Sequence, residues 1–505
     1  MEAGRRKSRE GLRWEQRQIR MGLRSPTLTW MLPMPACHIT TAPPSFSDAL
    51  EELQLLMARV AAGELSFGEY EQASREALRR LGRTMDAVAL QRDDIDAPVV
   101  WVDGVRCPQV GRWEASYLGC WGEVRVERSL YRPSGEDRSL CPLELRAGIV
   151  EGYWTPASAS LATWSVAHLT PAEAAELFKR SVGMSPSRST LDRLPKSLSE
   201  GWEAQRTRFE ESLRVGEEVP ETAVAVLVSL DGIMVPMKDG ERQKKRKTAR
   251  SRGKETRGPA GYREASSGTL SFVDVEGERV GDTRYVGRMP EKGKKTLKET
   301  LEDELLAVLD LRPDLKVVAV ADGARDNWTW LERVLPENSI LVLDFFHAAE
   351  HLKRGLDCAH GQDTPKAQAE FARLHLLLRD HPDGVKKVIN ALDYQRRQHP
   401  RRKRLKTELT YFRRNQRRMR YAAVQADKLP IGSGIVEAAN KTLVTVRMKR
   451  AGSRWTLDGG QAVLTFRALA KSKRFDRAWA LVSATYVQQV DLTQPARVLP
   501  FRRAA

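Results

Sequence analysis

Four acidic residues occupy the positions in this sequence from which chemistry is most easily built. Asp231 follows the apolar run AVAVLVSL, Asp322 follows KVVAVA, and Asp344 follows SILVL. Glu437 lies far downstream, inside GSGIVEAANK. Carboxylates that converge from separate strands and a helix can hold two divalent cations about 4 Å apart, an arrangement that promotes in-line displacement at phosphorus. Because Mg²⁺ and Mn²⁺ prefer oxygen ligands, either ion suits such a site.

Each of the first two aspartates also has a simpler interpretation. Asp231-Gly232 and Asp322-Gly323 are dipeptides typical of turns, and taken singly each is expected to form one. Taken together, in a basic chain and at the ends of strands that would be neighbours, they favour a metal site formed by Asp231, Asp322 and Glu437. The GSG segment before Glu437 is expected to make the sharp turn that delivers it.

The composition points to a polyanionic partner. The 505 residues include 84 Lys or Arg and 66 Asp or Glu, a formal net charge of +18 with a pI near 9.8, which favours nucleic acid over a merely solvated basic surface. No apolar run reaches the ~18 to 20 residues of a membrane helix, so we expect a cytoplasmic, nucleoid-associated protein. Five Cys without a C-x-x-C pair predict neither a disulfide framework nor a standard zinc site.

Three segments precede residue 150. Residues 1–45 lack sustained periodicity and predict disorder. Residues 46–92 repeat apolar positions every three or four residues and predict two amphipathic helices, broken at Gly63, that pack on their own domain or serve dimerisation. Residues 95–150 predict a small β module in which Asp103-Gly104 closes a hairpin.

Residues 151–215 contain the pattern of a helix-turn-helix, LTPAEAAELFKRSVGMSPSRSTLDRL. A first helix is followed by a turn at Gly183, an N-cap at Ser185 and a second helix that carries Arg188 and Arg193. Such a second helix can enter the major groove of DNA. The alternative is a pair of short helices joined by glycine that makes no contact with DNA.

From residue 221 the pattern becomes α/β. AVAVLVSLDGIMVPM, TLSFVDV and DTRYVGRM predict three strands, KKTLKETLEDELLAVL a helix, and KVVAVA and SILVLDFF two further strands. Three strands, a helix and a strand are the opening order of a ribonuclease H-like sheet. We therefore predict a multidomain α/β protein whose ribonuclease H-like catalytic domain spans 221–485, with an all-helical insertion at about 352–430 and a C-terminal tail at 486–505.

Two basic clusters supply candidate contacts to phosphates. RQKKRKTARSRGKETR, residues 242–257, is expected to be a flexible loop. Residues 401–420 hold ten Lys or Arg and only Glu408 as an acid, with Tyr411 and Phe412 interleaved on a helix. Phosphate contacts from such clusters raise affinity without specifying sequence, and the alternative for each cluster is a solvated face. The residues expected to contact DNA are Arg188, Arg193, Arg401, Arg402, Lys403, Arg404, Arg413, Arg414, Arg417, Arg418, Arg447, Lys449 and Arg450.

Several motifs together resemble one known family. VSLDG, VADGA, the D-x-x-H segment from Asp344 to His347, and PIGSGIVEAANKTLVTVRMKRAGSRW are similar to the DDE transposases of bacterial insertion sequences, in the Kra-type group related to mutator-like elements. The resemblance covers about residues 95–485. It is strongest at GSGIVE and from Arg447 to Trp455.

The resemblance implies the roles of five residues. Asp231, Asp322 and Glu437 would bind two catalytic Mg²⁺ or Mn²⁺ ions, with Asp344 and His347 accessory to them. It also implies metal-dependent cleavage of a phosphodiester at the ends of an insertion sequence, followed by strand transfer. The partners would be the terminal inverted repeats and target DNA, with the protein assembling on DNA as a homo-oligomer.

The chain departs from the family in its N-terminal module, which is often a cysteine-rich zinc ribbon. Residues 95–150 keep only the isolated Cys107, Cys120 and Cys141. The β module is therefore expected to be a degenerate version of that ribbon, and no zinc is expected in the protein. An inactive relic that binds DNA without cleaving it is an alternative function.

A rival motif overlaps the same segment. His347, Glu350 and His351 fit H-x-x-E-H, the inverted zinc-protease signature, in which two histidines bind zinc and the glutamate is the base. A protease leaves the two strand-end aspartates and the net charge unexplained. The simpler interpretation is that His351 lies on a helix surface and that His347 is hydrogen-bonded to Asp344.

Overall fold

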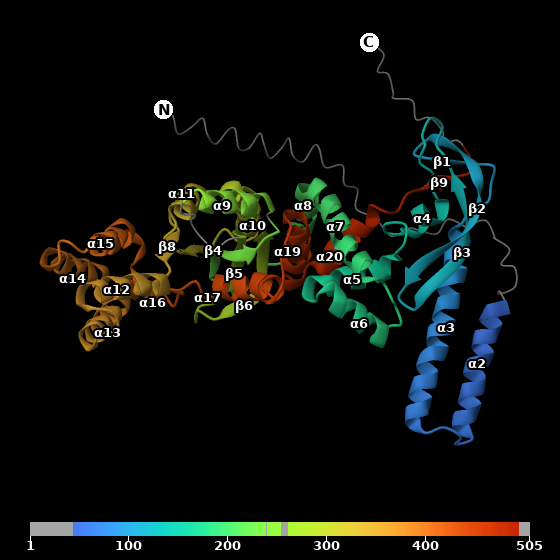
Figure 1. The fold of residues 1–505 in the computed structure, drawn as a ribbon, viewed down its shortest axis with the longest axis horizontal. Helices are drawn as coiled ribbons and strands as arrows, with labels where there is room; N and C mark the ends of the chain where they lie inside the picture. The colour runs from blue at the N-terminus through green and yellow to red at the C-terminus, as the bar shows by residue number, and fades with distance from the viewer. Residues whose placement is uncertain (1–43, 239, 254–260, 494–505) are drawn as a thin grey trace, which may run out of the picture. The chain divides into compact units, whose positions relative to one another are not determined.

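The computed structural model describes residues 44–238, 240–253 and 261–493 of a mixed α/β protein (Figure 1). The chain divides into two units, Met1–Asp48 and Ala49–Ala505, and the elements described below belong to the second, apart from the first residues of α2. The disorder predicted for residues 1–45 concerns positions almost wholly outside the described residues.

Two helices open the described chain, as predicted. α2 spans Pro44–Ala61 and α3 spans Phe67–Asp93. Ser66 begins α3 with a capping box, in which its hydroxyl accepts from the Glu69 amide and the Glu69 carboxylate accepts from the Ser66 amide. The predicted break at Gly63 lies in the turn between the two helices.

The predicted β module is an antiparallel sheet. Its strands are β1 (Val99–Val102), β2 (Val105–Gly119) and β3 (Gly122–Tyr131). The hairpin at Asp103-Gly104 is confirmed, because both residues have positive φ, 49° and 77°, as a two-residue primed turn requires. A short helix, α4 (Pro142–Ala147), follows.

The expected C-terminal tail is partly wrong. Within residues 486–493, the short strand β9 (Val490–Asp491) pairs with β1 and so extends the N-terminal sheet. The remainder of the expected tail, 494–505, lies outside the described residues.

The two helices of the predicted helix-turn-helix are present, but the predicted N-cap is wrong. α6 spans Pro171–Ser181 and α7 spans Arg188–Ala204, and the N-cap of α7 is Ser187, whose hydroxyl accepts from the Thr190 amide. Ser185 precedes Pro186, which disfavours helical backbone at the residue before it. The neighbouring helices are α5 (Pro156–His168) and α8 (Arg206–Arg214).

These helices share one apolar core with the C-terminal helices. Leu191, Leu194 and Leu198 of α7 are buried together with Phe466 of α19 and Phe475 of α20. The last two helices span Leu457–Lys471 (α19) and Phe475–Ala484 (α20). The helix-turn-helix region is therefore packed against residues that follow it by more than 250 positions.

A five-stranded sheet forms the centre of the α/β part. Its order is β6-β5-β4-β7-β8, with β4, β7 and β8 parallel and β5 and β6 antiparallel to their neighbours. The predicted succession of three strands, a helix and a strand is thus confirmed. Its elements are β4 (Ala225–Pro236), β5 (Tyr262–Val273), β6 (Arg279–Arg288), α10 (Lys295–Leu311), β7 (Lys316–Ala321), α11 (Arg325–Val334) and β8 (Ile340–Leu343).

The predicted loop at residues 242–257 is wrong over most of its length. Gly240–Ser251 form the helix α9. Lys, Arg, Gln and Ala, which dominate RQKKRKTAR, are good helix formers, and no Pro interrupts them. Residues 254–257 of the predicted loop lie outside the described residues.

Only helices follow between β8 and residue 426, as predicted, although they begin at Phe345 rather than near residue 352. They are α12 (Phe345–His360), α13 (Pro365–Asp380), α14 (Gly384–Gln398), α15 (Lys403–Asn415), a 3₁₀ turn (Gln416–Arg418) and α16 (Tyr421–Ala426). A continuous helical stretch then runs through α17 (Gly434–Ala439), a π-helical turn (Asn440–Thr445) and α18 (Val446–Met448). None of the described helices combines the length and apolar composition that crossing a membrane requires.

A buried ionic network ties the central sheet to the C-terminal helices. Glu304 of α10 is 1% exposed and accepts two hydrogen bonds of 2.8 Å from Arg474, which lies between α19 and α20. Arg284 of β6 contacts the same carboxylate, and Glu217 forms ion pairs with both arginines. Removing one member would leave an uncompensated buried charge, which costs far more than the pairing contributes.

We expect Arg474→Met to destabilise the protein by about 3–5 kcal/mol, because Glu304 would keep its charge without its closest partner. Chemical unfolding followed by circular dichroism measures the loss. Lys473→Gln is the matched control: its ion pair with Asp282 joins side chains that are 74% and 55% exposed, and such a pair contributes at most about 1 kcal/mol. Equal effects of the two substitutions would contradict the central role of the network.

Candidate active site

The register of three parallel strands brings three aspartates to one level. β4 pairs with β7 up to Leu230 opposite Ala321, and β7 pairs with β8 up to Ala321 opposite Leu343. The residue that follows the last of these paired positions on each segment is an aspartate. These aspartates are Asp231, Asp322 and Asp344. Since neighbouring strands lie about 4.8 Å apart, the carboxylates start from adjacent positions at the carboxyl edge of the parallel ladder.

Asp231 neither ends its strand nor forms a turn, so both sequence interpretations of its backbone are wrong. β4 continues to Pro236 along β5, with Asp231 opposite Ser267 and Gly232 opposite Ser266. The alternation of Ile233 and Val235 beyond the aspartate sustains the strand where the pairing with β7 has stopped. Asp231 therefore projects from the middle of a strand that is rigidly paired on one side.

The carboxylate of Asp231 is held by a buried hydrogen-bond chain. Its Oδ2 accepts from Asn440 Nδ2 at 2.6 Å, and Asn440 Oδ1 accepts from the Ser267 hydroxyl at 2.6 Å. Its Oδ1 accepts from the Gly232 amide at 2.7 Å. Burial raises the pKa of this carboxyl above its ordinary value, and the negative charge of Asp322 adds to the rise.

Asp322 both forms a turn, as its Asp-Gly dipeptide predicts, and lies beside Asp231, as a shared site requires. Its Oδ1 accepts from the Ala324 amide at 3.0 Å and from Asn327 Nδ2 at 3.2 Å, which fixes the first turn of α11. Its backbone carbonyl accepts from the Trp328 indole. The charge of Asp322 acts on Asp231, so the structure brings these two predicted ligands together.

Asp344 is 1% exposed and organises the backbone around it. It is the N-cap of α12, because its Oδ1 accepts from the His347 amide at 2.7 Å. Its Oδ2 accepts from the Ser433 amide, which lies 89 positions later in the chain. Gly432 passes so close that a β-carbon there would lie 2.7 Å from the Phe346 ring, which explains the glycine of the GSG segment.

The contact between His347 and Asp344 differs from the one expected. The main-chain amide of His347 makes the bond, whereas its imidazole is exposed and lies near Asp231, where its positive charge when protonated lowers the pKa of that carboxyl. His347 therefore holds Asp344 through its backbone, whereas its side chain belongs to the surroundings of the site through its charge.

Glu437 lies on α17, one turn after the segment that Asp344 fixes, and its side chain is exposed. Asn440, which binds Asp231, follows it by three residues and so shares its helix face. Among the described residues, no set of three or more His, Cys, Asp or Glu side chains is placed to hold one metal ion. Shared metal binding by Asp231, Asp322 and Glu437 stays a prediction.

The residues of the rival zinc motif are engaged elsewhere. The His351 ring stacks on Tyr411 with centroids 3.5 Å apart, and its Nδ1 lies 2.6 Å from Glu408 Oε2. Glu350 is exposed and faces Arg354 on its own helix. His351 thus packs against α15 and is not the free helix-surface residue of the simpler interpretation.

Sequence reasoning missed two charged residues beside Asp231. Lys294 Nζ lies 2.8 Å from Glu264 Oε1, and its charge lowers the pKa of Asp231. Glu264 stands over Gly232, where a β-carbon would meet the carboxylate at 1.8 Å. Neither residue lies in a recognisable motif. Asn440 carried a signal that was not used, since it lies one helical turn from Glu437.

The predicted DNA-contacting residues have different surroundings. Arg188 and Arg193 are exposed on the first turns of α7. Exposed positions without a recorded ion pair or hydrogen bond in the described residues are Arg401, Lys403, Arg417 and Lys449. Those with a protein partner are Arg402 (Cys358 carbonyl), Arg404 (Glu408), Arg413 (Asp393), Arg414 (Gly323 carbonyl), Arg418 (Glu332) and Arg450 (Glu173).

Arg447 is a correction to the predicted set. It is 3% exposed, donates to the Val166 carbonyl and lies over the Trp455 ring, and burial lowers the pKa of its guanidinium to about 10. No phosphate can reach it there. The aromatic residues of the 401–420 cluster are likewise not available for stacking, because Tyr411 and Phe412 are buried in the core.

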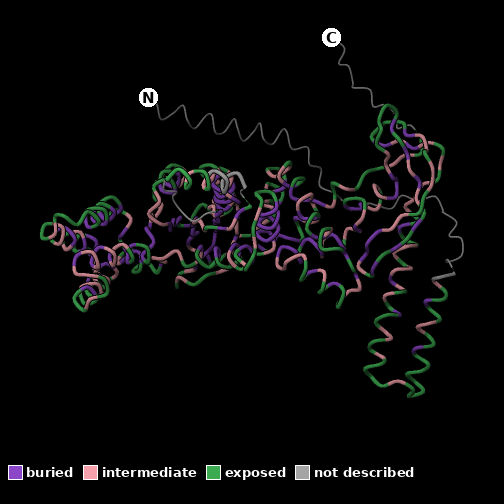
Figure 2. The backbone as a smooth tube through the Cα atoms, in the orientation of Figure 1, coloured by how far each residue is buried: buried purple, intermediate pink, exposed green. Residues whose placement is uncertain are grey.

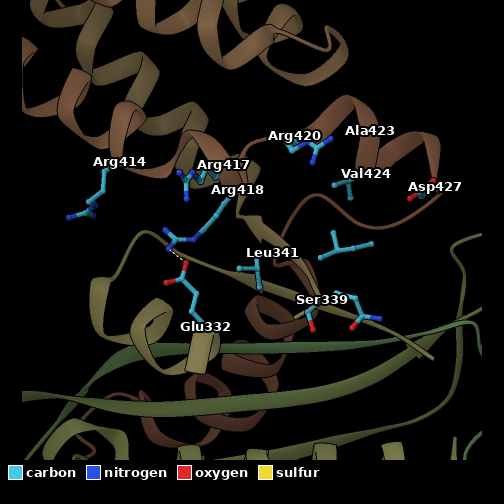
Figure 3. A pocket seen from close by; sticks show the side chains of 12 residues that line it. Glu332, Ser339, Leu341, Arg414, Arg417, Arg418, Arg420, Ala423, Val424 and Asp427 are labelled. Atoms are coloured by element: carbon cyan, nitrogen blue, oxygen red, sulfur yellow. Dashed lines mark hydrogen bonds and ion pairs between the residues drawn. The ribbon is translucent and has the colours of Figure 1, made fainter. Parts of the chain in front are cut away.

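A cavity of about 720 Å³ opens between α11, β8 and the helices that follow α15 (Figure 3). Arg414, Arg417, Arg418 and Arg420 line it, against only Glu332 and Asp427 as acids. Arg418 is paired with Glu332 and stacks on Trp328. Arg414 donates to the carbonyl of the residue after Asp322, so the cationic cavity adjoins the loop that bears this aspartate.

We expect Asp231→Asn to stabilise the protein at neutral pH in the absence of divalent cations. A raised pKa in the folded state favours the protonated carboxyl, so this contribution to stability is full below the unfolded pKa of about 3.9 and is lost as pH rises through the folded pKa. The gain from Asn should therefore vanish toward acid pH. Unfolding midpoints measured across pH test this, with the exposed Glu350→Gln as control; a gain independent of pH would contradict it.

The chain was compared with family models and with curated proteins. No family model matches the chain, and no curated protein matches it. The function is therefore argued from the residues of the site, their register and their charges.

Proposed function

We propose that this chain is a DNA transposase of the DDE type, similar to the Kra-type enzymes of bacterial insertion sequences, which cleaves phosphodiesters with Mg²⁺ or Mn²⁺ and joins the freed ends to target DNA. The observation that carries the proposal is the alignment of Asp231 and Asp322, each of which directly follows the last paired residue of the parallel ladder between β4 and β7. Asp344 follows on the third strand of the same ladder.

The strand order supports a ribonuclease H-like catalytic domain. Three consecutive antiparallel strands, a helix and then two strands parallel to the first give the order β6-β5-β4-β7-β8. In open α/β sheets, ligands bind outside the carboxyl ends of the strands. The helices α12 to α16 would then be the insertion between β8 and the helix that carries Glu437.

The donor set at this edge suits a hard divalent cation. Asp231 and Asp322 supply carboxylate oxygens, and Oδ2 of Asp322 has no recorded hydrogen bond within the described residues. Asp231, Asp322 and Glu437 would hold the ions. When bound, the metals would activate the attacking oxygen and stabilise the leaving one.

Residues around the carboxylates orient them and add positive charge beside them. Asn440 and Ser267 orient Asp231, and Asn327 orients Asp322. Asp344 fixes the turn from which the helix of Glu437 starts. Lys294 adds a positive charge beside the carboxylates, which suits a site that receives a phosphodiester.

The proposed reaction has two displacements at phosphorus. Water attacks the phosphodiester at the end of the element, and the bond to the 3′-oxygen breaks to leave a 3′-hydroxyl. That hydroxyl then attacks a phosphodiester of target DNA, which forms a new phosphorus–oxygen bond and releases a target 3′-hydroxyl. Each displacement exchanges one phosphorus–oxygen bond for another, and no covalent protein intermediate is required.

One observation favours a second function, DNA binding without cleavage. Asn440 donates to Oδ2 of Asp231 and so already occupies one of its oxygens. A relic that retains exposed cations such as Arg188, Arg193 and Arg417 would bind DNA and leave it intact. Cleavage of DNA that carries the element's own ends distinguishes the two functions.

We expect Asp231→Asn, Asp322→Asn and Glu437→Gln each to lower Mg²⁺-dependent nicking by more than about 100-fold, a loss typical of removing one electrostatic group from an active site. DNA binding in gel-shift assays should be largely unchanged. Glu350→Gln, an exposed acid on α12, is the matched control and should nick at the wild-type rate. Near-wild-type nicking by any of the three variants would remove that residue from the metal site.

We expect the cationic cavity to bind DNA phosphates without regard to sequence. Arg417 and Arg420 are exposed and line it without a recorded ion pair in the described residues. Arg417→Gln with Arg420→Gln should reduce the slope of log affinity against log salt by up to about 1.8, since each lost contact to duplex DNA removes about 0.9. Lys473→Gln is the control, because Lys473 does not line the cavity. An unchanged slope in the double variant would show that the cluster is merely solvated.

A further inference from the structure

We propose that Tyr411 is a positioning residue of the candidate site, whose hydroxyl hydrogen-bonds to a water of the divalent cation that Asp322 would hold. This inference deepens the proposed function and rests on it in one respect, that Asp322 binds a divalent cation. Because Tyr411 lies on α15, the inference makes the helical insertion a working part of the site.

α15 packs on the loop that follows Asp322 through two residues one helical turn apart. A β-carbon at Gly323 would lie 2.4 Å from Cε2 of Tyr411 and 3.0 Å from its hydroxyl oxygen, so the edge of the phenol ring lies against this glycine. Arg414 donates to the Gly323 carbonyl at 3.0 Å. Since Gly323 directly follows Asp322, the hydroxyl of Tyr411 lies at the loop that bears this carboxylate.

The ring of Tyr411 is held by a stacked histidine. Buried and exposed positions mix along the helices of the insertion (Figure 2), and His351 of α12 stacks on Tyr411 with 3.5 Å between centroids and 13° between planes. Glu408, one turn before Tyr411 on α15, lies 2.6 Å from Nδ1 of His351 and is 4% exposed. The protein therefore sets the direction in which the hydroxyl points.

Packing accounts for the ring of Tyr411 but not for its hydroxyl. Tyr411 is 9% exposed, and within the described residues its hydroxyl has no hydrogen-bond partner. A buried hydroxyl without a partner destabilises the folded protein, whereas a phenylalanine ring would pack in the same place. The adjacent core position is in fact a phenylalanine, Phe412. The hydroxyl of Tyr411 therefore points to an oxygen that the chain itself does not supply.

Two carboxylates of the site lie near this hydroxyl. Burial raises the pKa of Tyr411, and the charges of Asp322 and Asp344 add to the rise. Both oxygens of Asp344 already accept from backbone amides, those of His347 and Ser433. Oδ2 of Asp322 has no hydrogen bond recorded in the part of the chain that the structure describes. Asp322 is therefore the acid with an oxygen to offer a cation beside Tyr411.

A hydrated divalent cation suits these groups. Two neighbouring carboxylates oppose a free anion at the hydroxyl, and they attract a cation. Mg²⁺ keeps several of its waters when carboxylates bind it, and the hydroxyl oxygen of a tyrosine can accept a hydrogen bond from such a water. Because Tyr411 does not bond to Asp322 itself, a water on the cation is the partner that would satisfy it. Groups of this kind around a metal tune its affinity.

Tyr421 offers an internal comparison. It is 1% exposed, and its hydroxyl likewise has no partner among the described residues. Burial raises its pKa, and the charges that add to the rise are those of Tyr411 and Asp344. A change from Tyr to Phe at this position therefore removes an equally buried hydroxyl beside the acid whose two oxygens are already bonded.

Titration of the DNA-free full chain with Mn²⁺, followed by the electron paramagnetic resonance signal of free Mn²⁺, tests the proposal. The relevant site is the Mn²⁺ binding that Asp322→Asn abolishes. Tyr411→Phe should weaken this binding by about 10- to 100-fold, the usual effect of removing a group that supports a metal site from outside its ligands. Tyr421→Phe is the matched control and should leave the Kd unchanged.

Thermal unfolding in EDTA supplies a second readout, which a structural role of the hydroxyl would move in the opposite direction. We expect Tyr411→Phe to raise the unfolding temperature of the metal-free protein, because the substitution removes a buried hydroxyl without a partner. A lower unfolding temperature would show that the hydroxyl bonds within the protein, and it would overturn the proposal.

The Mn²⁺ titration separates this inference from the proposed function. Tight, Asp322-dependent binding that survives Tyr411→Phe would overturn the inference and leave the metal site standing. Equal weakening by Tyr421→Phe would also overturn it, since the loss would then come from the insertion as a whole. Wild-type binding that does not depend on Asp322 would overturn both. The expected loss in Tyr411→Phe without any nicking of DNA would support the inference and count against cleavage alone.

Discussion

The buried carboxylate of Asp344 is the constraint on which the geometry of the site depends. It caps α12 through the His347 amide and holds the Ser433 amide from the far end of the helical excursion. The Phe345 amide adds a bond to the Ile431 carbonyl at the same point. The chain therefore leaves the sheet at β8, forms five helices and returns to within hydrogen-bonding distance of its point of departure, which fixes where the helix of Glu437 begins.

The order of strands was predictable from sequence because the parallel strands are covered on both faces and so appear as continuous apolar runs. Their register was not predictable. A shift of one residue preserves the composition of such runs while moving every side chain to the other face. The level placement of Asp231 and Asp322 is decided by the pairing of Leu230 with Ala321, which no local pattern encodes. For the same reason the continuation of β4 beyond Asp231 was missed, since a turn and a strand are both compatible with Asp-Gly.

Errors in the predicted binding residues arise from contacts that are distant in sequence. Arg447 looks like a free cation in RMKR, but the carbonyl that it binds belongs to Val166, 281 positions earlier. Tyr411 looks like a stacking residue among arginines, but its neighbour His351 comes from another helix. Helical periodicity indicates that a face is covered without indicating what covers it. Exposed cations such as Arg188 were predictable because the capped first turn of a helix leaves them in solvent.

Asn440 couples the charge of Asp231 to the helix that carries Glu437. It is 4% exposed, it donates to Asp231, and it begins a π-helical turn. Such turns contain one more residue per hydrogen-bonded ring than the α-helix and occur often at functional sites. Because an amide group can both donate and accept, Asn440 can satisfy Asp231 while accepting from Ser267. A change in the charge or ligation of Asp231 must therefore act on the helix at this residue, one turn from Glu437, so the acids of the site are linked through the backbone even where their side chains do not touch.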